Sequence, residues 1–191
     1  MIQVKRTIKA KVNPHRILVG DIIGFTLTDG EYVEAMAVEK TDRGVLFTTV
    51  DCLKEEYRMN PTNTNEGDYE KSELRQKLNS EILNRFPEEL KKIMLPHENG
   101  DLLRIPTERE IFGENKYGEQ DDAERWAPMK LRRNRMALEG YNGDIQWYWL
   151  QNPHKDYVST FASVTTSGNA TNYSASIALG VRPVFLLKSS I

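Results

Sequence analysis

The most distinctive run of chemically useful side chains in this sequence carries no charge. Between Tyr157 and Ser176, eleven of twenty residues are Ser, Thr or Asn, and no charged residue occurs from Tyr157 to Val181. Hydroxyl and amide groups form adaptable hydrogen bonds, and tyrosine rings add rigid contact area, as in antibody-like binding surfaces. We therefore predict that this region binds a protein or a glycan. The candidate contact residues are Tyr157, Asn169, Asn172, Tyr173, Ser174 and Ser176.

The same run also has the pattern of a β-hairpin. Ser167-Gly168-Asn169 would form its turn, because Gly and Asn tolerate the backbone angles of tight turns. Apolar residues on both sides of this turn could pack against a core; they are Val158, Ala162, Val164, Tyr173, Ala175, Ile177 and Leu179. Because a hairpin has two faces, one face can pack while the other binds, and both interpretations remain open.

Residues suited to catalysis or metal binding are few and scattered. The only cysteine, Cys52, lies in a strand-like segment and is expected to be a small buried side chain. The three histidines, His15, His97 and His154, have no neighbouring ligands at helix or strand spacing. Neither a glycine-rich phosphate loop nor a nucleophile elbow is present. We expect no catalytic site, no metal site and no cofactor.

Two clusters of charge have a simpler interpretation than a binding site. Asp121, Asp122 and Glu124 could hold a cation, but a solvated loop is the better interpretation. A basic cluster precedes three aromatic residues, a combination that could pair phosphates and stack bases. The nearby acidic residues weaken the positive field of this cluster. We therefore interpret it as an exposed charged loop and do not expect a nucleic-acid partner. The basic and aromatic residues are Lys130, Arg132, Arg133, Arg135, Tyr141, Trp147 and Trp149.

Composition and length indicate one folded domain spanning residues 1–191. Hydrophobic residues make up 39% and charged residues 28% of the 191, and the formal net charge of −2 gives no global attraction to nucleic acid or acidic membranes. No segment has the apolar length of a signal peptide or a membrane-spanning helix. We therefore expect a cytoplasmic protein without a membrane partner, or a virion component if the gene belongs to a phage.

The elements that must position the candidate surface follow from local patterns. Alternating apolar residues and the Asp29-Gly30 turn predict an antiparallel meander over about 16–53. Ser72 as N-cap, followed by apolar residues at helical spacing, predicts a helical middle over about 70–113, which includes a Thr107–Glu110 capping box. A long irregular loop over about 114–144 precedes a C-terminal sheet region over about 145–187.

Two separated motifs resemble those of a family of uncharacterised bacterial and prophage domains, DUF6273. They are Tyr148-Trp149-Leu150-Gln151-Asn152-Pro153 and Gly180-Val181-Arg182-Pro183-Val184-Phe185. In the family an aromatic-Trp-Leu-Arg-Ser-Pro motif precedes a terminal Gly-Val-Arg-Pro motif, and the resemblance covers roughly Val19 to Leu187. This sequence departs from it at Gln151 and Asn152, where Arg and Ser are usual.

The family is distantly similar to the C-type-lectin-like fold, which also serves formylglycine-generating enzymes. The resemblance implies an α+β fold with a twisted antiparallel sheet, one or two main helices, long ordered loops and terminal strands that lie close together. No acid adjoins Gln151-Asn152-Pro153 to complete a calcium-sugar site, and Cys52 has no second cysteine for formylglycine chemistry. A non-catalytic binding or display domain, prophage-encoded, is the leading prediction. The alternatives are a structural or assembly subunit that forms a homo-oligomer, and a degenerate enzyme of the formylglycine-generating type.

Overall fold

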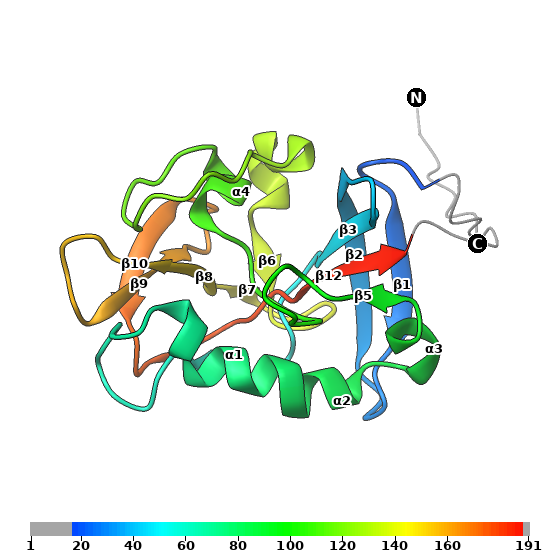
Figure 1. Ribbon diagram of the computed structural model, residues 1–191, viewed down its shortest axis with the longest axis horizontal. Coiled ribbons are helices and arrows are strands. Elements are labelled where there is room, and N and C mark those ends of the chain that lie inside the picture. Colours follow the sequence, from blue (N-terminus) through cyan, green and yellow to red (C-terminus); the bar gives the residue numbers. More distant parts are fainter. Residues whose placement is uncertain (1–16, 189–191) are drawn as a thin grey trace.

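The computed structural model describes residues 17–188, and it begins with a three-stranded antiparallel meander (Figure 1). The meander consists of β1 (Ile22–Thr26), β2 (Tyr32–Lys40) and β3 (Gly44–Thr49). Gly30 turns the first hairpin with a φ of 93°, a value that L side chains rarely adopt. These three strands lie within the meander predicted over about 16–53, and the last of them ends at Thr49.

The C-terminal strand completes this sheet from the far end of the chain. Strand β12 (Val184–Lys188) pairs antiparallel with β3 and, on its other side, with β5 (Met94–Leu95). The sheet order is therefore β1-β2-β3-β12-β5, so that both ends of the described chain share one sheet. The expected closeness of the terminal strands is a direct consequence of this pairing.

One long helical segment links the two halves of the molecule (Figure 1). It runs through α1 (Glu73–Lys77), the π-helical turn η3 (Leu78–Ile82) and α2 (Leu83–Arg85). Ser72 caps it as predicted, because its hydroxyl accepts a hydrogen bond from the Arg75 backbone N–H at 3.1 Å. After Pro87 the short helix α3 (Glu88–Lys91) leads toward β5.

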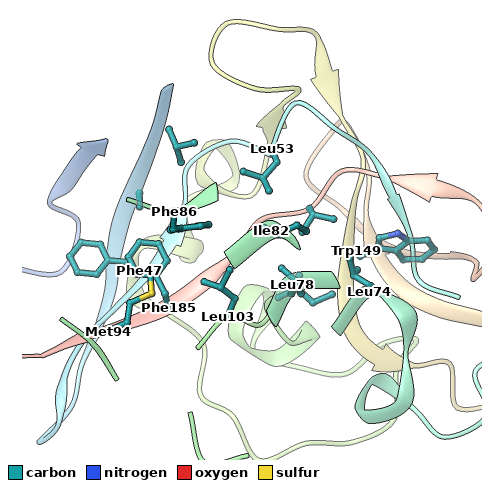
Figure 2. Close-up of a cluster of buried hydrophobic side chains, with 14 of the residues drawn as sticks. Phe47, Leu53, Leu74, Leu78, Ile82, Phe86, Met94, Leu103, Trp149 and Phe185 are labelled. Carbon is teal, nitrogen blue, oxygen red and sulfur yellow. The ribbon is translucent and has the colours of Figure 1, made fainter. Parts of the chain in front are cut away.

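The apolar stripe of this helix points into the main core, as Figure 2 shows. Leu74, Leu78 and Ile82 are all fully buried there. At one end of the core the rings of Phe47 and Phe185, from neighbouring strands, stack with centroids 5.7 Å apart. Each such fully buried side chain contributes about 1.5–3 kcal/mol of hydrophobic stabilisation, so the core fixes the helix against the sheet.

A second sheet stands at the other end of the molecule (Figure 1). Strands β8 (Tyr148–Pro153), β9 (Thr160–Val164) and β10 (Ala170–Ser174) form it in the order β10-β9-β8. Because side chains alternate along a strand, Trp149 enters the main core while Tyr148 enters a smaller, second core. The sheet is therefore anchored on both faces.

Short elements fill the remaining chain. The predicted long loop over 114–144 is irregular but contains two 3₁₀ turns and a two-residue strand. Within the predicted helical middle, Arg104 forms one isolated β-bridge, to Val184. The short elements are β4 (Tyr57–Arg58), η2 (Tyr69–Lys71), α4 (Glu108–Phe112), η4 (Ala127–Lys130), η5 (Arg132–Asn134), β6 (Ala137–Leu138), β7 (Ile145–Gln146) and β11 (Ala178–Leu179).

The described chain is thus a mixed α and β structure with mostly antiparallel strands, a curled sheet and one main helix, as the sequence predicts. None of the helices within residues 17–188 has the length and apolar character needed to cross a bilayer.

Candidate functional site

The predicted hairpin exists, and its tip is fastened to the preceding loop. Strands β9 and β10 pair in register, with Val164 opposite Ala170, and Gly168 turns between them with a φ of 71°. The guanidinium Nε of Arg132 donates to the Ser167 carbonyl at 2.7 Å, and that of Arg135 donates to the Gly168 carbonyl at 3.1 Å. The two arginines thereby hold the hairpin tip in place.

Strand β10 is the outer strand of its sheet and has one free edge within the described chain. The backbone N–H of Thr165 donates to the Asn169 carbonyl, and that of Ala175 donates to the Ser159 carbonyl. Together with the register of the two strands, these bonds show that the odd-numbered residues of β10 form the hydrogen bonds with β9. The backbone groups of Ala170, Asn172 and Ser174 consequently point away from β9.

The side chains of β10 also present free polar groups. Tyr173 is 40% exposed, and its ring meets that of Trp147 edge to face with centroids 5.5 Å apart. Within residues 17–188 the side chains of Asn172, Tyr173 and Ser174 form no hydrogen bond to one another or to a neighbour. These groups can therefore bind a ligand without first breaking an internal bond.

The opposite end of β10 is tied to the loop over residues 60–68. The hydroxyl of Ser176 donates to Asn63 Oδ1 at 2.5 Å, and the side-chain amide of Asn65 donates to the Tyr157 carbonyl at 3.0 Å. Tyr157 itself is 61% exposed, with its ring against His154 at 4.5 Å between centroids. This end thus presents a second group of the predicted residues.

All six predicted contact residues lie at the surface of the β9–β10 hairpin and its ends. Three lie on β10, Asn169 lies at the tip, and Ser176 and Tyr157 lie at the opposite end; none is buried. The Ser-, Thr- and Asn-rich run as a whole is less exposed to solvent, because Phe161 to Val164 of the central strand β9 are buried. The predicted surface is therefore the outer strand and its ends rather than the whole run.

A buried carboxylate in α4 lies next to β8, and sequence patterns give no sign of it. Glu108 is fully buried and accepts hydrogen bonds from the Tyr117 and Gly118 backbone N–H groups, the latter at 2.7 Å. Burial raises the pKa of the Glu108 carboxyl above its usual range, although these hydrogen bonds oppose the shift. The side chain of Asn152 accepts from the Glu108 N–H at 2.7 Å, so the motif residue fastens β8 to α4.

The acidic cluster needs one correction. Asp121 was expected to be solvated, but its carboxylate accepts hydrogen bonds from the Asn115 amide at 3.0 Å and the Asn152 amide at 2.8 Å. It also accepts from the Ala123 N–H at 2.9 Å. Asp121 therefore orders the loop, whereas Asp122 and Glu124 are exposed as expected.

The basic cluster and the aromatic residues do not form one surface. Trp149 is fully buried in the main core, and Tyr141 packs against Tyr32 with ring centroids 5.0 Å apart. Arg132 and Arg135 are engaged by the hairpin tip. The stacking platform that a basic and aromatic nucleic-acid site needs is thus not assembled from these residues.

The arginine of the Gly-Val-Arg-Pro motif is a structural tie rather than an exposed group. Arg182 is 1% exposed, and its guanidinium donates to the Thr49 carbonyl at 2.9 Å and the Tyr148 hydroxyl at 3.1 Å. It thereby joins the two sheets. Gly180 is required beside it, since a Cβ there would lie 2.5 Å from the Cys52 sulfur.

The described residues offer little support for a catalytic or metal site built from cysteine or histidine. Burial raises the pKa of the Cys52 thiol to about 12, so hardly any thiolate exists at neutral pH. No group of three or more His, Cys, Asp and Glu side chains in residues 17–188 is arranged to hold a metal ion. His15 lies outside the described residues.

An open hollow of about 780 Å³ lies between the β1–β2 turn and the turn that follows β6. The edge-to-face pair of Tyr32 and Tyr141 forms one wall. Arg85 in this hollow is already paired with Asp29, at 2.5 Å, and with Glu31. These internal ion pairs stabilise the hairpin turn.

Comparison with known proteins gives one match. Residues 108–189 match the model of a family described as Domain of unknown function (DUF6273). The matched segment contains both motifs, from Tyr148 to Pro153 and from Gly180 to Phe185, and it supports a relationship to an uncharacterised domain family. No curated protein and no solved structure matches the chain.

Proposed function

We propose that this chain is a non-catalytic binding or display domain that recognises a protein partner through the hairpin surface. The hairpin surface consists of Tyr157, Asn169, Asn172, Tyr173, Ser174 and Ser176. A glycan is the alternative class of ligand.

One observation carries this proposal. The outer strand β10 combines uncharged side chains that have no internal hydrogen bond with a backbone edge that has no partner in the described chain. Tyr and Asn supply contact area and hydrogen bonds at low cost in conformational entropy. The bonds from Arg132 and Arg135 to the hairpin tip, and from Ser176 to Asn63 at the other end, hold the hairpin in place, which lowers the entropy cost of binding.

We extend the proposal to a distant relationship with the C-type-lectin-like fold, in a prophage-encoded protein. The antiparallel strands, the single main helix and the pairing of β12 with β3 support the relationship to this fold. A lectin-type calcium site is not part of the proposal, because the Gln151 amide donates to the Ile105 carbonyl and Asn152 is buried.

The proposal is tested by probing protein and glycan arrays with the full chain and two tyrosine variants. For any ligand found, Tyr173→Ala should weaken binding at least about tenfold, as loss of a central aromatic contact does at interfaces. Tyr141→Ala is the matched control, since Tyr141 is also exposed but lies in the hollow beside Tyr32. Binding that survives Tyr173→Ala and Asn172→Ala unchanged would reject the hairpin surface.

A second candidate function is that of an assembly subunit, and the free edge of β10 favours it specifically. A degenerate enzyme of the formylglycine-generating type gains no support from Cys52, whose thiol is buried and has a raised pKa.

A further inference from the structure

We propose that the partner of the β10 edge is a second copy of this chain, paired antiparallel about Asn172. This inference rests on the proposed function, because it uses the same hairpin surface. It adds the identity of the partner, the register of the pairing and the groups that make it.

The backbone of β10 fixes which groups are available. Ala170, Asn172 and Ser174 direct their N–H and C=O groups away from β9, because the alternate positions Thr171 and Tyr173 bond to it. The Ser174 carbonyl also accepts from the Ile177 N–H at 3.0 Å, and a carbonyl oxygen has a second lone pair for another donor.

This spacing is complementary to itself. When two β10 strands run antiparallel with Asn172 opposite Asn172, Ala170 of each copy lies opposite Ser174 of the other. Every pair then joins two residues whose backbone groups point toward each other, which is the hydrogen-bonded type of antiparallel pair. The two three-stranded sheets would become one continuous sheet of twice the width.

The side chain at the centre of this register is also self-complementary. A primary amide is both donor and acceptor, so the Asn172 side chains of the two copies can bond to each other. Asn172 shares its face of the sheet with the buried Ala162, which leaves no bulky neighbour opposite it on β9.

Charges at the two ends of β10 fit the antiparallel arrangement. At the hairpin-tip end Arg132 and Arg133 are exposed. At the other end the loop over residues 60–68, fastened to Ser176 by Asn63, carries the exposed acids Glu66 and Asp68. An antiparallel pair brings the basic end of one copy toward the acidic end of the other, which steers the two copies together.

Nothing on the edge itself opposes the pairing. Natural edge strands are usually blocked by a charge, a proline or a bulge, and β10 with the sequence Ala-Thr-Asn-Tyr-Ser has none of these. Since a single strand buries little area, we expect weak, concentration-dependent association rather than an obligate dimer.

Charge-swapped variants test the register directly. Asn172→Lys places two ammonium groups opposite each other, and Asn172→Asp places two carboxylates there, so each variant alone should be monomeric. An equimolar mixture of the two should form a heterodimer at least about tenfold tighter than either variant with itself. Sedimentation equilibrium of the full chain, from about 1 μM to about 1 mM protein, measures all three samples.

A second pair of variants separates backbone from side chain. Asn172→Pro removes an outward N–H without removing a bond to β9, so it should abolish the wild-type dimer while the circular dichroism spectrum stays native. Asn172→Ala keeps the edge and should weaken the dimer only a few-fold. Equal effects of the two substitutions would overturn pairing through the backbone.

The outcomes distinguish this inference from the proposed function. A wild-type chain that stays monomeric up to about 1 mM, or charge variants that fail to associate in the mixture, would overturn the second copy as partner. If the monomer then binds an array ligand in a way that Tyr173→Ala abolishes, an external partner occupies the hairpin surface and the proposed function stands.

Discussion

Arg182 is a buried guanidinium that is held by hydrogen-bond acceptors, and within residues 17–188 it forms no ion pair. Its hydrogen bonds reach β3 at Thr49, β8 at Tyr148 and the η5 turn at Asn134. Its guanidinium also lies over the Tyr148 ring at 5.0 Å. One side chain thus connects three segments that are far apart in sequence.

Replacing Arg182 should therefore be costly. Arg182→Ala leaves buried acceptors without donors, and we expect a loss of about 3 kcal/mol or more in the free energy of unfolding. Arg133→Ala is the matched control and should change stability by less than about 0.5 kcal/mol, because Arg133 is exposed. Urea unfolding of both variants measures the difference, and equal stabilities would show that Arg182 is not a structural tie.

The side chain of His97 makes the stability of the folded chain depend on pH. Burial, assisted by the nearby Arg104, lowers the pKa of His97 from 6.5 to about 4. The unfolded chain takes up this proton near pH 6.5 and the folded chain only near pH 4. Between these values the unfolded state binds more protons, so the stability present above pH 6.5 falls as the pH falls toward 4.

We expect His97→Gln to reduce the loss of stability between pH 7 and pH 5, since the variant has no proton to take up at this position. Unfolding by urea at both pH values, for wild type and variant, measures the two losses. An equal loss in the two proteins would mean that His97 titrates normally in the folded state.

At the scale of single elements, Asn79 ties the main helix to the segment before α4. Its side chain accepts from the Leu102 N–H at 2.9 Å and donates to the Leu103 carbonyl at 2.8 Å, from within the π-helical turn η3. We predict that Asn79→Ala costs about 2 kcal/mol of stability, although Ala is the better helix former.

The same helix contains a control for this substitution. Asn84→Ala replaces an exposed asparagine in α2, where the change should be near neutral or slightly stabilising. Thermal or urea unfolding of both variants tests the difference. An Asn79→Ala protein as stable as Asn84→Ala would remove the proposed role of the side chain.

The elements that local signals specify could be predicted from sequence, and the contacts between distant elements could not. The Ser72 cap and the Thr107–Glu110 capping box occur as expected, because each involves residues three apart. The bonds of Glu108 to Tyr117 and Gly118, and of Asp121 to Asn152, depend on loop geometry that leaves no periodic trace. The six candidate contact residues could be proposed from sequence because their types are unusual together, and whether they bind a ligand stays a prediction. The free edge of β10 is visible only in the sheet order.

At the scale of the whole molecule, an aromatic cluster connects the two ends of the described chain. Phe185 of β12 packs against Phe47 of β3 and against Phe25 and Phe86, with ring centroids 5.7 to 6.1 Å apart. The main core then continues to Trp149 of the second sheet. This continuity is the physical basis for expecting one cooperative domain.

Phe185→Ala should accordingly destabilise the whole chain by about 3–5 kcal/mol. Trp149 lies in the second sheet and Trp147 directly precedes it, whereas Trp126 shares the smaller core with Val184 and Leu186 of β12, so tryptophan fluorescence reports on both sheets. We expect the fluorescence and circular dichroism transitions to coincide and to shift together in the variant. Separate transitions, with only one shifted, would indicate two independent domains.

The central claim is that β10 is an open strand edge with free groups at alternate positions. Backbone amide hydrogen exchange, followed by NMR residue by residue in dilute protein, tests it most directly. The N–H groups of Ala170, Asn172 and Ser174 should exchange quickly, while those of Thr171 and Tyr173 should be protected by β9. Equal protection along the whole strand in dilute protein would contradict an open edge.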